Sequence, residues 1–449
     1  MAPFESDARH NAMAIGMPKL SVKAISESKI AGLPAERIVK AAKQAARLAI
    51  DGLMKEEGIK KGEIVLPKTF TFEGKDYYEA SEKMEKYFLN RLMSDGFPVV
   101  PPTKEAVDKM LEGTDLPRGH LVGVVGNGSG LATVEKIAIN AAMAGCLPQY
   151  MPVIIAAVEA ITDPAYDLFR VQSTAGPAAP LLIVSGPKLI DDLNINDGYS
   201  TIGPGWKANS TIGRALRLIL INIGHSWPGK NDMKSVGLFP KFTALMAENE
   251  GAYRGFWEPL RVEEGFGKDQ ATVSVMTANS LKVIPGATVD TYVEETASAM
   301  KGAYNAEARA WGEENLLLLN PATFDVFYEA KLSRADVQKM LFQAGQVPCS
   351  KFAKYRGVPI PAHVLAKLPQ IPEWVINSCK QSMENLVPIV PKPQDIKIIA
   401  AGGPTGGGAY FIDTWGFGTS FFTTKAIKLP KNWNNLLKKY EGWETPIIK

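Results

Sequence analysis

The sequence predicts an α/β fold in which mixed or parallel sheet layers are covered by apolar helices, with a helical N-terminal lead-in. Three runs rich in Leu, Ile and Val, at residues 179–185, 315–319 and 396–400, have the length of buried strands. Each is followed within two residues by Gly or Pro, and helical patterns separate them. Strands that alternate with helices at this spacing form layered α/β sheets, which is why we predict this class.

The chain has the size and composition of a globular protein with more than one domain. Its 449 residues are 46% apolar and 22% charged. We expect a helical N-terminal arm and lead-in at residues 1–95, and an α/β core domain with glycine loops at residues 96–330. An irregular lid falls within this core at residues 224–265. A helical excursion and a C-terminal strand and glycine-loop segment follow at residues 331–449.

Charge and hydropathy argue against two classes of partner. The formal net charge is +3, and Lys and Arg form no dense block interleaved with aromatic residues, so we expect no nucleic-acid partner. No apolar run reaches the roughly 18–20 residues of a membrane span, and the N-terminus lacks a secretory-signal pattern. Cys146, Cys349 and Cys379 lie far apart without C-x-x-C spacing, so we expect a cytoplasmic protein and no metal site.

The first hundred residues contain helical patterns and an arm. Residues 35–53 and 80–93 have the spacing of amphipathic helices, and a proline-rich connector at residues 94–103 leads to a helix at residues 104–111. Residues 1–24 have the pattern of an irregular arm. Such arms usually lie across a neighbouring domain or subunit, so we expect a homo-oligomer.

A glycine loop, GNGSG at residues 126–130, stands between a predicted buried strand at residues 121–125 and a predicted helix at residues 133–144. A helix N-terminus behind such a loop aims backbone N–H groups and the positive end of the helix dipole at one point, which suits a phosphate or carboxylate. The alternative is that the loop only closes a corner between strand and helix. The expected anion-binding residues are Gly126, Gly128, Ser129 and Gly130.

Polar residues in and after this apolar helix are candidates for catalysis. Glu135, Lys136 and Asn140 stand out because burying a polar group without a partner costs about 2–7 kcal/mol. Cys146, at the hinge before a second apolar helix, could be a thiolate whose pKa the helix dipole lowers. The alternatives are that the two charged residues reach solvent, that Asn140 is bonded inside the core, and that Cys146 is an inert packing residue.

A second glycine turn, at residues 203–205, precedes another apolar helix. The sequence T-I-G-R at residues 211–214 of this helix resembles T-V-E-K at residues 133–136 of the first helix. We infer two facing helices whose N-termini converge on one anion. Lys136 and Arg214 each lie near a helix start, where a cation opposes the helix dipole, so each needs an anionic partner. The candidate anionic partners within the protein are Glu135 and Glu248, and the alternative partner is an anionic substrate. The residues that we expect to contact the ligand here are Asn209, Ser210, Thr211 and Arg214.

The lid and a third glycine turn complete the predicted site. His225 is a candidate acid or base or else a helix cap. Glu248 and Glu250, with Asn249 between them, offer two carboxylates that could bind a metal or serve as a general base, or else form a solvated turn. Gly402 and Gly403 follow the strand at residues 396–400, at the edge where ligands bind α/β sheets. The alternative for these glycines is a tight turn into a hairpin at residues 409–427. We expect the glycine loops at residues 126–130 and 402–408 to approach one another.

Several blocks of sequence resemble the large protein associated with the UGSC-motif (seleno)protein family. These blocks are SDGFPVVPPT, ATVEKIAINAAMAGCLPQYMPVIIAAVEA, GPGWKANSTIGRALRLILINIG, and AENE with WEPL, in that order, over about residues 80–430. The resemblance implies a small redox domain with a selenocysteine-Gly-Ser-Cys or Cys-Gly-Ser-Cys motif. No such tetrad occurs in this chain, so the small domain is a separate subunit or this protein works without it.

These patterns together favour a cytoplasmic enzyme that acts on a small anionic organic substrate. Its chemistry would be thiol-linked redox or lyase chemistry with a small redox (seleno)protein partner, and the sequence identifies no cofactor. The alternatives are a non-catalytic subunit that scaffolds a redox partner, and a Cys-dependent hydrolase. The catalytic candidates are Cys146, Glu135, Lys136, His225 and Glu248.

Overall fold

The computed structural model describes residues 69–126, 130–302, 314–355, 358–359, 371–406, 408–414 and 420–443, with isolated residues at 39, 42–43 and 46–47. It has an α/β fold, as predicted, and contains two four-stranded mixed sheets. None of the described helices is long and apolar enough to cross a bilayer. Most of the predicted helix at residues 35–53 lies outside the described residues, and the five described there are helical.

Each sheet has parallel and antiparallel neighbours. Sheet 1 has the order β14-β5-β3-β4, and sheet 2 has the order β12-β7-β13-β6. The strands of sheet 1 are β3 (Ala179–Ser185), β4 (Leu245–Ala247), β5 (Thr272–Ala278) and β14 (Thr423–Ala426). Those of sheet 2 are β6 (Lys282–Ile284), β7 (Asn315–Leu319), β12 (Ile396–Ala400) and β13 (Ala409–Ile412).

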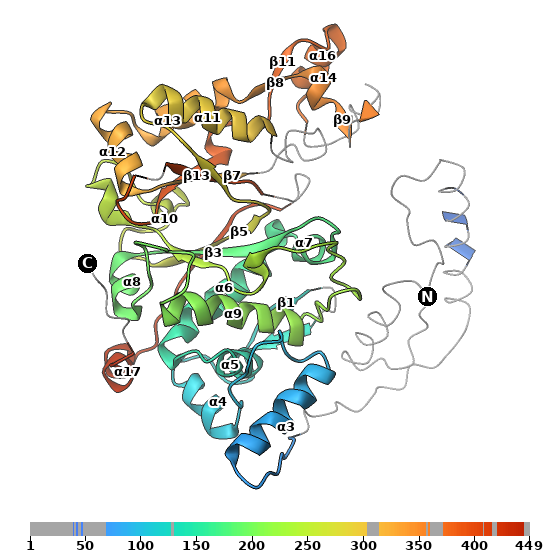
Figure 1. Cartoon of the computed structure of the whole chain (residues 1–449), viewed down its shortest axis with the longest axis vertical. Coiled ribbons are helices and arrows are strands. Elements are labelled where there is room, and N and C mark those ends of the chain that lie inside the picture. The colour runs from blue at the N-terminus through green and yellow to red at the C-terminus, as the bar shows by residue number, and fades with distance from the viewer. Residues whose placement is uncertain are drawn as a thin grey trace.

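The main helices cover the outer faces of the sheets, and shorter helices fill the loops (Figure 1). The helices of the first half are α3 (Tyr77–Asn90), α4 (Lys104–Leu111), α5 (Val134–Met143), α6 (Met151–Ile161), α7 (Leu168–Ser173), α8 (Pro187–Leu193), α9 (Lys207–Asn222) and α10 (Leu260–Glu263). Those of the second half are α11 (Val289–Gly302), α12 (Pro321–Glu329), α13 (Arg334–Ala344), α14 (Cys349–Phe352), α16 (Glu373–Gln381) and α17 (Trp433–Lys439).

The two sheets pack face to face, which gives four layers: helices, sheet 1, sheet 2, helices (Figure 1). Successive side chains of a strand point to opposite faces, so Leu182 and Val184 of β3 join the core under α6 and α9, while Leu181 and Ile183 join the core between the sheets. Strand β7 alternates in the same way. Both faces of these strands are buried, which explains why they are continuous apolar runs.

The two sheets repeat one topology and exchange their last strand. In each, a central strand (β3 or β7) has a parallel neighbour (β4 or β12) and an antiparallel neighbour (β5 or β13). Strand β6 follows β5 in the chain but pairs with β13, and β14 follows β13 but pairs with β5. The predicted hairpin at residues 409–427 is therefore wrong, since β13 and β14 belong to different sheets.

The predicted domain boundary between residues 330 and 331 does not separate two structural units. It divides sheet 2, because β7 precedes this boundary while β12 and β13 follow it. The segment after α13 forms a small lobe, in which a disulfide joins Cys349 and Cys379 (Figure 1). The cysteines therefore no longer favour the cytoplasm, because two of the three are joined. The strands of this lobe are β8 (Gln346–Pro348), β9 (Lys354–Tyr355), β10 (Val358–Pro359) and β11 (Leu386–Pro388).

Candidate functional site

The two ends of the first glycine loop, Gly126 and Gly130, adjoin paired strands rather than the start of a helix. Strand β1 (Leu121–Val125) pairs antiparallel with β2 (Gly130–Thr133), and only then does α5 begin, capped by the Thr133 side chain. All of β1 except its last residue is exposed or half-buried, contrary to the prediction. A Cβ at Gly130 would lie 1.7 Å from the carbonyl oxygen of Ile223, so close packing explains this glycine. Gly126 packs against Gly224, while Gly128 and Ser129 lie outside the described residues.

The polar residues of α5 have structural partners or reach solvent. Glu135 forms an ion pair with Arg118 at 2.5 Å, and Lys136 is exposed. The Asn140 side chain donates to the carbonyl of Lys136 and accepts from Asn222 at 2.7 Å. These positions correspond to the structural alternatives rather than the catalytic ones.

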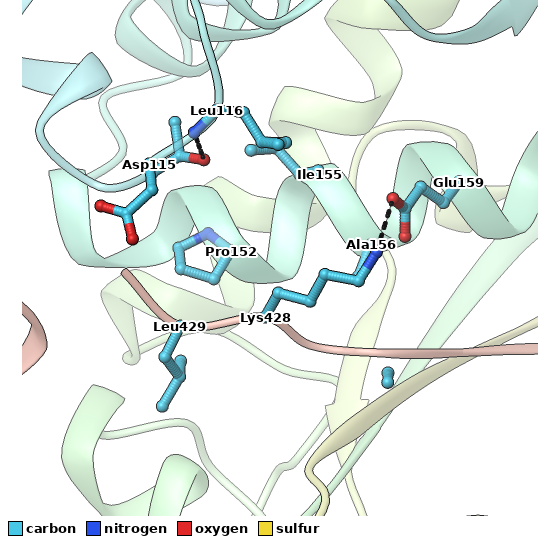
Figure 2. Close-up of a pocket in the computed structure, with 10 residues that line it drawn as sticks. Asp115, Leu116, Pro152, Ile155, Ala156, Glu159, Lys428 and Leu429 are labelled. Atoms are coloured by element: carbon cyan, nitrogen blue, oxygen red, sulfur yellow. Dashed lines mark hydrogen bonds and ion pairs between the residues drawn. The ribbon is translucent and has the colours of Figure 1, made fainter. Parts of the chain in front are cut away.

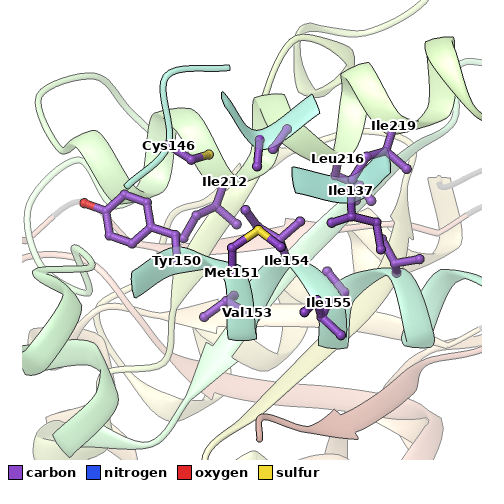
Figure 3. Packing of buried hydrophobic residues seen from close by; sticks show 14 of the residues in the cluster. Ile137, Cys146, Tyr150, Met151, Val153, Ile154, Ile155, Ile212, Leu216 and Ile219 are labelled. Atoms are coloured by element: carbon purple, nitrogen blue, oxygen red, sulfur yellow. The ribbon is translucent and has the colours of Figure 1, made fainter. Parts of the chain in front are cut away.

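Cys146 is a packing residue. It lies among the apolar side chains between α5, α6 and α9, near Met151 and Ile212 (Figure 3), and donates to the Thr211 carbonyl at 3.2 Å. Burial raises the pKa of the thiol to about 12, whereas a helix-activated cysteine would have a lowered pKa. The prediction of a reactive thiolate is therefore wrong.

The start of α9 is also structural. The helix begins at Lys207, so Asn209, Ser210 and Thr211 lie within its first turns rather than in a ligand loop. Asn209 is buried and bonds to the backbone of Asn196, and the Thr211 hydroxyl donates to the carbonyl of Lys207.

Arg214 already has its anionic partner. It holds Asp95 through two hydrogen bonds of 2.8 and 2.9 Å, so neither Glu135, Glu248 nor a substrate is needed to balance it. The N-termini of α5 and α9 do not converge. The segment just after α5, at Cys146, contacts the start of α9, which makes the two helices antiparallel.

Glu248 links the two sheets. It is fully buried and accepts hydrogen bonds from Ser185 (2.6 Å), Tyr253 (2.7 Å) and the backbone N–H of Leu260 (2.9 Å). The Tyr253 hydroxyl in turn accepts from the N–H of Ala400 in sheet 2. Burial raises the pKa of Glu248, and the hydrogen bonds from Ser185, Tyr253 and Leu260 oppose that rise. A carboxylate enclosed in this way holds the fold together and cannot reach a substrate.

The carboxyl ends of β4 and β12 meet beside the third glycine turn. The backbone N–H of Asn249 donates to the carbonyl of Ala400 at 2.8 Å, and that of Gly402 donates to the carbonyl of Asp197 at 2.7 Å. The ring of Tyr199 fills the space that a Cβ at Gly403 would need. These hydrogen bonds use main-chain groups and fix the turn.

The third glycine turn and the first glycine loop do not approach one another. Gly403 packs on Tyr199, in the segment that the buried Asn209 ties to the start of α9, whereas Gly126 and Gly130 pack on residues 223–224 at the end of that helix. The 16 residues of α9 span roughly 24 Å. The two glycine loops therefore do not share a small-molecule site.

His225 lies just after the C-terminal end of α9. Its backbone is left-handed (φ 54°), and its ring lies 5.1 Å from that of Trp227. A left-handed residue is common where a helix ends. The position corresponds to the helix-cap alternative rather than to an acid or base.

The stretch after α9 contributes a buried cationic cluster that no sequence pattern had indicated. We call it the Arg217 cluster, and it consists of Arg217 on α9 with Asp232, Lys234 and Lys241 from the segment that leads to β4. Asp232 lies 2.5 Å from Lys241 and 3.4 Å from Lys234. The side chains of Asp232 and Lys234 are 2% and 1% exposed, and Arg217 is 6% exposed. Three cations therefore surround one buried carboxylate.

The pKa values in the cluster follow from burial and from these neighbours. Burial lowers the pKa of Lys234 to about 8, and Asp232 opposes that shift while Lys241 and Arg217 add to it. Burial would raise the pKa of Asp232, but the cations outweigh it and hold this pKa below its ordinary value. At neutral pH the cluster thus carries three positive charges and one negative charge.

Several polar groups in and beside the cluster have no partner in the described part of the chain. Arg217 donates from Nε to the carbonyl of Lys241, while its two terminal nitrogens make no hydrogen bond or ion pair there. The amide of Gln172 on α7 is buried without a hydrogen bond, although the backbone carbonyl of this residue accepts from Lys234. The buried hydroxyl of Tyr166 makes no bond of ordinary geometry, although Thr277 and Arg217 are near enough to lower its pKa against the effect of burial.

Such a cluster can bind an anion and transfer protons. Unpaired guanidinium nitrogens suit a carboxylate or phosphate, and an amide and a hydroxyl can complete its hydrogen bonds. One signal in the sequence could have revealed the site. Arg217 interrupts the buried face of α9 between Leu216 and Leu218, where a cation needs a partner or a ligand.

A pocket of about 210 Å³ lies between α6 and the segment after β14 (Figure 2). Its wall is mainly apolar, and Lys428 and Glu159 pair across 3.6 Å at its edge. None of the predicted site residues lines it, so we do not place the functional site there. The lining residues are Thr114, Asp115, Leu116, Pro152, Ile155, Ala156, Glu159, Ala426, Lys428 and Leu429.

Comparison with family models, curated proteins and solved structures finds no match to this chain. Within the described residues, no three His, Cys, Asp or Glu side chains lie close enough together to hold a metal ion. The candidate site therefore rests on the geometry of the Arg217 cluster.

Proposed function

We propose that the protein is an enzyme that binds a small anionic organic substrate at the Arg217 cluster. One observation carries the proposal: the terminal nitrogens of Arg217 have no partner among the described residues, inside a buried cluster with excess positive charge. Like charges held together away from water are costly, and an anionic ligand would offset that cost.

The cluster favours electrostatic stabilisation of an anionic substrate over thiol attack by this chain. Lys234 directs its ammonium to Asp232 and to the carbonyls of Val171 and Gln172, and its pKa of about 8 lets it change the charge of the cluster near neutral pH. Arg217 and Lys241 would stabilise negative charge that develops on the substrate. Cys146 is buried and protonated, which argues against a Cys-dependent hydrolase. Thiol-linked redox or lyase chemistry would need a thiol or selenol from a separate redox partner.

A second candidate is a non-catalytic subunit that scaffolds such a partner. Val236 and Phe239, in the segment that carries Lys234 and Lys241, are 95% and 90% exposed. Exposed apolar side chains gathered beside a functional cluster are a common feature of protein interfaces. Turnover by the purified chain alone would favour the enzyme, and turnover only with a co-purified second protein would favour the scaffold.

The cytoplasmic location also remains a proposal. The disulfide between Cys349 and Cys379 favours an oxidising compartment, because cytosolic thiols are usually kept reduced. Alkylation of thiols in intact cells before lysis, followed by mass analysis, decides between the two. Labelling of both cysteines supports the cytoplasm, and protection of both contradicts it.

Calorimetric titration of the full chain with a panel of small carboxylates and phosphates tests the proposed site. Arg217→Gln should weaken binding of any ligand found by about 10- to 100-fold, the effect of losing a charge-assisted hydrogen bond. Lys136→Met is the matched control, because Lys136 is exposed and lies outside the cluster. Binding that survives Arg217→Gln unchanged contradicts the proposal.

A further inference from the structure

We infer that the ligand of the Arg217 cluster is a dianion, with one anionic oxygen on Arg217 and a second on Lys241. The inference rests on the proposed function and adds the charge and the two attachment points of the substrate. It follows from a count of the charges in the cluster and from the positions of the donors that have no partner among the described residues.

The charge count requires two negative charges. Arg217, Lys234 and Lys241 are cations, and Asp232 balances one of them. Arg214, on the same helix, is balanced by Asp95 and adds no excess. A monoanion would leave one positive charge of the cluster without a counter-charge, whereas a dianion would neutralise the cluster.

The donors fall into two groups. Lys234 uses its ammonium on the carbonyls of Val171 and Gln172 and on Asp232, so it has little left for a ligand. Arg217 offers two terminal nitrogens, with Tyr166 and Gln172 as neutral donors near the cluster. Lys241 makes one bond to Asp232 and keeps an 18% exposed side chain, which leaves N–H groups for a second anionic oxygen of the ligand.

Binding of a dianion should also hold a proton on Lys234. The groups that face this lysine are Asp232 and Lys241 from its own segment, Arg217 from α9, and two carbonyls at the end of α7. Two added negative charges would favour its charged form, so the complex should take up protons when it forms at about pH 8.

Two matched pairs of probes test the inference by calorimetry on the full chain at about pH 7.5: succinate against butyrate, and methyl phosphate against dimethyl phosphate. We expect the dianion of at least one pair to bind about tenfold or more tightly than its monoanion. The pair that shows this preference identifies the ligand as a dicarboxylate or a phosphate ester. Lys241→Met should remove the preference, Lys241→Arg should keep it, and Lys136→Met should not change it.

The outcomes separate the inference from the proposed function. If monoanion and dianion bind with equal affinity, and Arg217→Gln weakens the binding of both, the inference of a dianionic ligand is wrong but the proposed anion site stands. No binding of any probe or of the wider acid panel overturns both. A preference that persists in a folded Lys241→Met variant overturns the second attachment point.

Discussion

Arg214 and Arg217 lie one turn apart on α9 and differ in their partners. Of these two arginines, only Arg214 forms an ion pair with a carboxylate of the described chain, that of Asp95. The two residues should therefore respond differently to the same substitution. Arg214→Met would leave the buried Asp95 unpaired and should lower the free energy of unfolding by about 3–5 kcal/mol. Arg217→Met removes an unbalanced cation and should leave this free energy unchanged or raise it, while anion binding weakens by about 10- to 100-fold.

Urea unfolding and calorimetric titration of both variants check this contrast. Arg214→Lys, which keeps a positive charge beside Asp95, serves as the control for the first variant. An Arg217→Met protein that unfolds as easily as Arg214→Met would show that Arg217 is an ordinary structural residue.

The lowered pKa of Lys234 predicts a pH-dependent stability. The unfolded chain binds this proton up to about pH 10.5, whereas the folded chain releases it near pH 8, so the unfolded state holds more protons between the two values. Stability should therefore rise with pH across this window, by at most about 3 kcal/mol. The measurement is urea unfolding at about pH 7 and about pH 10 of the wild type and of Lys234→Met, which should lack this increment. Equal pH dependence of the two proteins contradicts the assignment.

Cys146 should be chemically silent. Its thiol is buried with a pKa of about 12, so it should not react with a thiol reagent at about pH 8 until the chain unfolds. Cys146→Ala should retain ligand affinity and any turnover, with a stability loss of about 1–2 kcal/mol from lost packing. Rapid labelling of the native protein at Cys146 would restore the thiol hypothesis.

Glu248 should matter for stability and not for binding. Glu248→Ala leaves the buried Ser185 and Tyr253 hydroxyls without their acceptor and should cost about 3–5 kcal/mol. Glu248→Gln keeps the shape and an acceptor oxygen, so it should cost less. Thermal unfolding measures both losses, and calorimetry checks that ligand affinity stays the same. A stable Glu248→Ala protein that no longer binds ligand would place Glu248 in the site after all.

The disulfide should stabilise the lobe after α13. Cys349 and Cys379 are 30 residues apart in sequence, and closing a loop of that size typically contributes about 2–4 kcal/mol. Replacing both cysteines with Ser should lower the unfolding free energy by that amount and leave anion affinity unchanged, since the lobe carries none of the cluster residues. Free thiol at both positions in the isolated, unreduced protein would contradict the pairing.

The strands that the sequence predicted best are those buried on both faces. Residues 179–185, 315–319 and 396–400 match β3, β7 and β12, because a strand between a helix layer and a second sheet must be apolar throughout. The exchange of β6 and β14 between the two sheets could not be predicted, because it depends on pairing partners that are distant in the chain.

The site was harder to predict for the same reason. Asp95 and Arg214 are 119 residues apart, and nothing local shows that they meet. Asp232, Lys234 and Lys241 lie in a stretch without periodicity, where charged residues usually face solvent. Local patterns instead favoured the glycine loops and Cys146, whose small side chains are explained by close packing.

The most direct test of the anion site is a crystal structure of the full chain soaked with selenate, a tetrahedral dianion whose position is marked by anomalous scattering. We predict an anomalous peak within hydrogen-bond distance of the terminal nitrogens of Arg217 and of Lys241. A map with selenate bound elsewhere and none at Arg217 would contradict the anion site.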